Sequence, residues 1–130
     1  MDEEAAGRLR ALCQAVAAGD VAPYDGAWDM WGLGMTHAVK DGKADDVAWA
    51  HWLIWGALTD WIELKPDEKA MADAAIVDAA GEWLVAEGDP ATVKAYLDRM
   101  VFEVCGYERP ANPPRKGGAW AGILNRVRRG

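Results

Sequence analysis

The stretch WAHWLIWGALTDW, from Trp49 to Trp61, holds four of the chain's eight tryptophans. Successive residues of an α-helix are rotated by about 100°, so with Trp49 at zero, Trp52 lies at about 300° and Trp55 at about 240°. Trp61 lies at about 120°, so the four indoles point in different directions from one axis. A helix that is apolar all round is normally surrounded by other helices. We therefore predict that this segment forms the buried central helix of a bundle.

Two other interpretations of the tryptophan-rich segment are weaker. A ligand cage needs indoles that converge from different elements, whereas these four radiate from a single helix. A membrane-surface helix needs a strongly charged face, which this segment lacks. The longest uncharged run, residues 47–59, is also shorter than the about 20 residues that span a bilayer. We expect no membrane span, and we expect each buried indole N–H to find a polar partner.

The rest of the chain reads as further helices, because apolar residues recur at helical spacing between glycines and prolines. Segment 20–26 (DVAPYDG) is predicted to be a loop and segment 40–46 (KDGKADD) a polar turn, and no strand is expected. The fold class is therefore all-α, a single-domain bundle of about five helices around the Trp-rich central helix. The predicted helices begin near Asp2, Ala27, Asp45 or Asp46, Pro66 and Pro90.

The second predicted helix, residues 27–39, places Trp28, Trp31 and Met35 on one side. It also contains Gly32 and Gly34, each of which costs about 1 kcal/mol relative to alanine in a helix interior. We expect a close approach of another helix to compensate for this cost.

Charge divides the chain into two regions. Residues 1–108 hold all 21 acidic residues but only eight basic ones, a net charge of −13. Residues 109–130 hold the other six basic residues and no acidic one, which gives +6. We predict an acidic helical bundle over 1–108, followed by a basic Pro/Gly-rich linker and a short amphipathic helix that contains Trp120.

Few residues in the chain suit catalysis or metal binding. There is no serine, there are only two cysteines and two histidines, and no Glu-x-x-His metal motif occurs. We therefore predict no catalytic residue, no metal site and no cofactor, and we expect His51 to be a core histidine hydrogen-bonded to backbone or to an indole. The acidic N-terminal residues and the two isolated thiols predict a cytoplasmic protein.

The charge balance favours a binding function. An acidic body attracts basic proteins and repels nucleic acid, so we expect a basic protein partner and no direct nucleic-acid contact. The leading hypothesis is a small acidic protein-binding module, of immunity-protein or inhibitor type, that masks its partner. The predicted partner-binding residues are Asp73, Asp78, Glu82, Trp120, Arg126, Arg128 and Arg129.

Two alternatives remain open. The first is a helical protein that binds a small molecule or a metal, and that could be an enzyme, with a pocket near Trp28, Trp31, His37 and His51. The second is a subunit or adaptor that docks through its C-terminal helix. If that helix docks on a second copy of the chain, the result is a homodimer formed by swapping.

Overall fold

The computed structural model describes residues 1–109, and the prediction of an all-α bundle is confirmed. The five α-helices are α1 (Glu3–Ala18), α2 (Pro23–His37), α3 (Asp46–Leu64), α4 (Lys69–Ala86) and α5 (Pro90–Asp98). A π-helical turn, η2 (Arg99–Val104), continues α5, and a 3₁₀ turn, η1 (Pro66–Glu68), precedes α4. Strands β1 (Val39–Lys40) and β2 (Lys43–Ala44) complete the structure.

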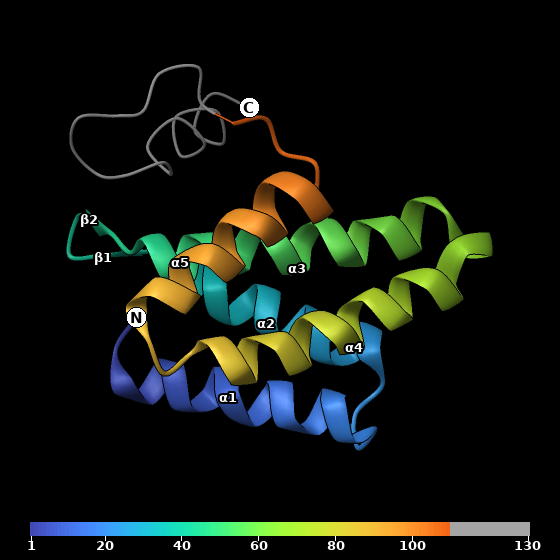
Figure 1. Cartoon of the computed structure of the whole chain (residues 1–130), viewed down its shortest axis with the longest axis horizontal. Helices are drawn as coiled ribbons and strands as arrows, with labels where there is room; N and C mark the ends of the chain where they lie inside the picture. Colours follow the sequence, from blue (N-terminus) through green and yellow to red (C-terminus); the bar gives the residue numbers. More distant parts are fainter. Residues whose placement is uncertain (110–130) are drawn as a thin grey trace.

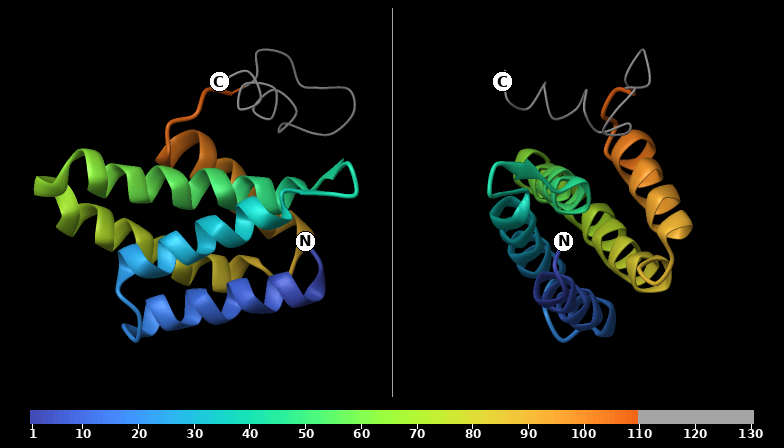
Figure 2. Two further views of the ribbon diagram at one scale, coloured as in Figure 1. Left: turned by 180° about the vertical axis from the view of Figure 1, so that it is seen from behind. Right: turned by 90° about the vertical axis from the view of Figure 1, so that its left-hand side faces the viewer.

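The helices pack as two neighbouring pairs, α2 with α3 and α1 with α4, and α5 with η2 packs on α3 and α4. Helix α2 packs along α3, and α1 packs against α4 and α2 (Figure 1). Helix α5 and η2 then lie against α3 and α4, as the end-on view in Figure 2 shows. Helix α3 therefore contacts α2, α4, α5 and η2, whereas α2 has one long side that faces away from the bundle.

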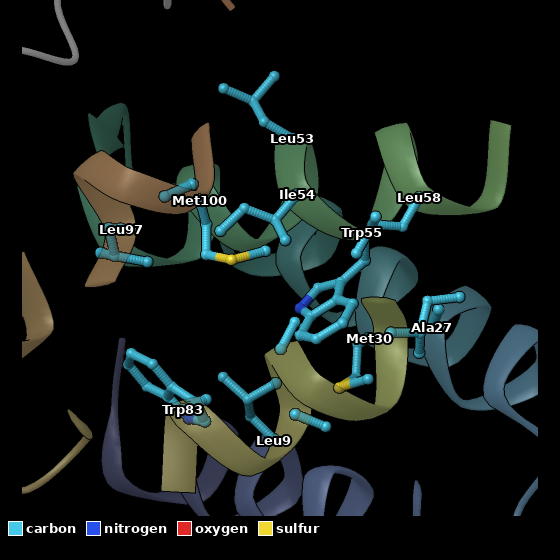
Figure 3. Packing of buried hydrophobic residues seen from close by; sticks show 14 of the residues in the cluster. Leu9, Ala27, Met30, Leu53, Ile54, Trp55, Leu58, Trp83, Leu97 and Met100 are labelled. Carbon is cyan, nitrogen blue, oxygen red and sulfur yellow. The ribbon is translucent and has the colours of Figure 1, made fainter. Parts of the chain in front are cut away.

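The core forms where four helices meet. Leu9 of α1, Met30 of α2, Trp55 of α3 and Trp83 of α4 converge there (Figure 3), and all four are buried. The other tryptophans of α3 have different environments, because Trp49 is buried while Trp52 and Trp61 are half-buried. The indoles that radiate from the α3 axis thus reach both the core and the edge of the bundle. The expectation that each buried indole N–H finds a polar partner is confirmed for Trp55 and wrong for Trp49 and Trp83, whose Nε1 atoms have no hydrogen-bond partner among the described residues.

Glycine allows the backbones of α2 and α3 to touch. A Cβ atom added at Gly34 would lie 2.6 Å from the Trp52 nitrogen and 2.8 Å from the Ala48 oxygen, both of which are backbone atoms. The predicted close approach is therefore confirmed at Gly34. It is wrong at Gly32, where an added Cβ atom would meet open space.

Local structure differs from the sequence prediction in three places. Segment 20–26 is not a loop throughout, because α2 already begins at Pro23, whose fixed φ suits a first helical turn. Pro66 begins a 3₁₀ turn, so α4 starts only at Lys69. The polar turn contains a short antiparallel hairpin in which Val39 pairs with Ala44, against the expectation of no strand.

Aspartates cap α1 and α3, the helices that were predicted to begin near Asp2 and at Asp45 or Asp46. The Asp2 carboxylate accepts a hydrogen bond of 2.8 Å from the Ala5 nitrogen, and Asp45 accepts one of 3.0 Å from Ala48. Each carboxylate satisfies a backbone N–H that has no partner within the helix.

None of the helices within residues 1–109 has both the length and the apolarity that crossing a bilayer requires.

Candidate functional site

Helix α2 buries one side in the bundle, leaves Tyr24 and Trp31 half-buried at its edge and exposes Trp28 to solvent. Its buried residues are Gly26, Ala27, Met30, Leu33 and Gly34. Trp28 is 46% exposed and Met35 is 45% exposed, although both are large and apolar. Exposed apolar residues that lie together on a surface mark sites of interaction. The outward side of α2 is therefore the candidate site.

A groove of about 470 Å³ lies at this surface. Gly32 contributes no side chain to it, and Trp28, Trp31 and His37 line it, so the structure brings together three residues of the predicted small-molecule pocket. The remaining lining residues are Arg8 and Leu12 of α1 and Asp29, Leu33, Met35 and Thr36 of α2.

Three aromatic residues form a continuous ladder on α2, which we call the aromatic strip: Tyr24, Trp28 and Trp31. The Tyr24 and Trp28 rings are stacked, with centroids 6.3 Å apart and planes inclined by 21°. The Trp28 and Trp31 centroids are 5.0 Å apart, with an inclination of 33°. At its far end Trp31 packs over Gly56 of α3, where an added Cβ would lie 3.0 Å from the indole Cδ1. The strip therefore follows the boundary between α2 and α3.

Carboxylates from both helices flank the aromatic strip. The Tyr24 hydroxyl donates a hydrogen bond of 2.6 Å to Glu63 of α3. This hydrogen bond raises the pKa of Tyr24, and desolvation and the negative charges of Asp25 and Asp60 raise it further. Asp29 lies one turn after Asp25 and lines the groove. The ladder thus lies in a negative electrostatic environment.

Most basic side chains of the bundle are paired with acids away from the strip. Lys69 pairs with Asp73 at 2.5 Å, and Arg99 pairs with Glu82. Two of the predicted partner-binding acids, Asp73 and Glu82, are therefore already neutralised within the chain, while the third, Asp78, is exposed.

The acids beside the strip differ in this respect. Among residues 1–109, no lysine or arginine forms an ion pair with Asp25, Asp29 or Asp60. Part of the uncompensated charge of the body is therefore present at the aromatic strip, while exposed acids such as Asp41 and Asp89 carry other parts of it.

His51 does not reach the groove, because α3 turns it into the core. The indole Nε1 of Trp55 donates a hydrogen bond of 3.0 Å to His51 Nδ1, which confirms the predicted contact with an indole. The Trp83 ring lies edge-on to the His51 ring, with 4.4 Å between the two ring centroids. Burial lowers the pKa of His51 to about 3, although Asp45 acts in the opposite direction. His51 is therefore neutral and separate from the other residues of the predicted pocket.

Neither cysteine is activated for chemistry. Both are free thiols, and burial raises the pKa of Cys13 and of Cys105 to about 12. Across the part of the chain that the structure describes, no group of three or more histidine, cysteine, aspartate or glutamate side chains could hold a metal ion. The chemistry available at the site is therefore stacking and charge.

Sequence reasoning missed five members of the site: Tyr24, Asp25, Asp29, Asp60 and Glu63. Tyr24 fell in the segment predicted to be a loop, yet its spacing to Trp28 and Trp31, four and seven residues on, is helical. No local signal joins this ladder to Asp60 and Glu63, because their proximity depends on how α2 packs along α3.

The remaining predicted site residues belong to the C-terminal region. Trp120, Arg126, Arg128 and Arg129, together with the predicted linker and final helix, lie outside the described residues. Comparison with protein-family models, with curated proteins and with solved structures finds no match to this chain.

Proposed function

We propose that the chain is a small acidic protein-binding module that uses the aromatic strip and its flanking carboxylates to hold and mask a basic protein, as an immunity protein or inhibitor does. The carrying observation is that Asp25, Asp29 and Asp60 flank an exposed tryptophan without an ion pair inside the described bundle. A negative surface of this kind attracts basic partners and speeds their encounter.

Charge and thiol chemistry support two further parts of the proposal. Repulsion between the acidic body and phosphate groups argues for a protein partner and against direct binding of nucleic acid. Free Cys13 and Cys105 support a reducing compartment, which here means the cytoplasm.

A second candidate function is the binding of a small molecule in the groove beside the strip. The observation that favours it is that Trp28, Trp31 and His37 line one groove of about 470 Å³. This volume falls within the range of about 300–1,000 Å³ that ligand pockets occupy. A ligand held there by stacking on an indole would respond little to salt.

Two triple variants of equal charge test the protein-binding proposal. The first carries Asp25→Asn, Asp29→Asn and Asp60→Asn, beside the aromatic strip. The control carries Glu4→Gln, Asp41→Asn and Asp89→Asn, at exposed positions elsewhere. Calorimetric titration with a basic peptide of alternating lysine and arginine gives the affinity of each protein.

The strip variant is expected to lose at least about tenfold more affinity than the control at about 50 mM NaCl. Wild-type binding should also weaken steeply as salt rises, because screening acts on exposed charges. Equal losses in the two variants would show that only total charge matters and would contradict the proposed surface. Affinity that is indifferent to salt would contradict the charge-based function and favour the small-molecule groove.

A further inference from the structure

We infer that the aromatic strip recognises an arginine side chain of the basic partner, whose guanidinium packs on the part of the Trp28 indole that Tyr24 and Trp31 leave exposed while the neighbouring carboxylates accept its N–H groups. This inference rests on the proposed function, because it takes the partner to be basic. It adds the type of residue that is recognised and the surface atoms that recognise it.

The strip is fixed before a ligand arrives. Trp28 is held between the rings of Tyr24 and Trp31, at 6.3 Å and 5.0 Å between centroids. Tyr24 is held in turn by its hydrogen bond to Glu63, and Trp31 by its contact with Gly56. Because these side chains are already ordered, little conformational entropy is lost when a planar group packs on the exposed part of Trp28.

The chemistry of the strip matches a guanidinium better than an ammonium ion. An arginine head group is planar and weakly hydrated, so it can stack on an indole and still donate two parallel hydrogen bonds to a carboxylate. The acids available for this are Asp25 and Asp29, one turn apart on α2, and Asp60 on α3. A lysine ammonium would keep more of its water and make a less specific contact.

Two basic side chains line the groove and would repel a guanidinium, so we place the arginine contact at the Tyr24 end of α2. Arg8 and His37 line the groove as well, and a bound cation would be repelled by Arg8. His37 is 13 residues from Tyr24, about 20 Å along the helix axis. The N-terminus of α2 carries only about half a positive charge from the helix dipole, which Asp25 in its first turn offsets. The carboxylates of Asp25, Asp60 and Glu63 therefore dominate around Tyr24, whereas Arg8 shares the groove with Trp28 and Asp29.

Two peptides of equal length and charge test the inference with the full chain, one alternating arginine with glycine and one alternating lysine with glycine. At about 50 mM NaCl the arginine peptide is expected to bind at least about threefold more tightly. Trp28→Ala should weaken the arginine peptide by about fivefold to tenfold and abolish the preference, while Trp28→Phe should retain part of it.

Matched variants separate local recognition from general effects. Val85→Ala removes another exposed apolar side chain, 86% exposed on α4, and should leave both affinities unchanged. Asp29→Asn should reduce arginine binding more than Asp41→Asn, although both remove one charge. Thermal unfolding checks that each variant is folded.

The two proposals fail in different ways. Equal affinity for the two peptides, with no effect of Trp28→Ala, would overturn the inference and leave the acidic binding function standing if binding still weakens with salt. Failure of both peptides to bind at low salt would overturn the inference and the proposed function together.

Discussion

His51 links the chemistry of one residue to the stability of the whole fold. It is fully buried and neutral, with a pKa of about 3 against an ordinary value of 6.5. Below pH 6.5 the unfolded chain takes up a proton here that the folded chain does not, so stability falls until the pH approaches 3. We expect this residue alone to remove about 2 kcal/mol of unfolding free energy between about pH 7.5 and pH 5. Urea unfolding at several pH values measures the effect.

The matched control for this prediction is His51→Phe. This variant leaves the Trp55 N–H without its acceptor, so it should be less stable by about 1–3 kcal/mol at neutral pH. Its stability should nevertheless depend less on pH, because the buried base is gone. His37 is present in both proteins, so it does not contribute to the difference between them. An unchanged pH dependence would show that His51 is not the group responsible.

The role of His51 could be predicted from sequence, but the members of the strip could not. The helical spacing from His51 to Trp55 already offered an indole partner one turn away, and the structure uses it. The outward position of Trp28 had no such signal. It depends on Gly34, which brings α2 against α3 and so determines which side of α2 is buried.

At the level of helices, alanine substitutions at Gly32 and Gly34 are expected to change the stability of the fold in opposite directions. Gly34→Ala forces a Cβ to within 3 Å of α3 backbone atoms that cannot move aside, so we expect a destabilisation of about 3 kcal/mol. Gly32→Ala adds its methyl group in open space and should stabilise α2 by about 0.5–1 kcal/mol. Urea unfolding of both variants measures this difference, and the same sign for the two changes would contradict the packing of α2 on α3.

The elements that sequence predicted well are those whose boundaries carry clear chemistry. Pro90 and Asp45 mark the starts of α5 and α3 as expected, one as the first helical residue and the other as a cap. Pro23 carried the same signal, but the surrounding polar residues concealed it. The hairpin was missed because its strands are only two residues long and exposed, although Asp41-Gly42 is a typical turn pair and both residues have positive φ.

For the molecule as a whole, the net charge can be counted from the sequence, but the sequence does not show which acidic side chains are paired with basic ones. Ion pairs such as Arg10 with Glu87 join helices that are far apart in the chain, so only the packed structure shows which acids remain uncompensated. Sequence reasoning had placed Asp73, Asp78 and Glu82 of α4 in the binding site. The pairing of Asp73 and Glu82, together with the exposed Trp28, moves the candidate site to the side of α2.

A shortened chain ending at Arg109 tests whether the described bundle is a complete folding unit. All its buried apolar residues lie between Ala5 and Phe102, so we expect its unfolding free energy to stay within about 1 kcal/mol of the full chain. Removing residues 110–130 leaves nine basic and 21 acidic residues, a net charge of −12 in place of −7. The comparison therefore belongs at about 0.3 M NaCl, where self-repulsion is screened. A larger loss would indicate that residues 110–130 pack on the bundle.

Trp28 is 46% exposed whereas Trp55 is wholly buried, so the intrinsic tryptophan fluorescence of the protein should distinguish the surface from the core. Excitation of its indoles should yield a red-shifted emission component that a neutral quencher such as acrylamide can reach and a blue-shifted one that it cannot. Anything that covers the outer side of α2 should shield the part of the first component that Trp28 contributes, while half-buried Trp52 and Trp61 of α3 keep their share and the second component stays unchanged. Occupancy of that surface can therefore be followed in the unlabelled protein.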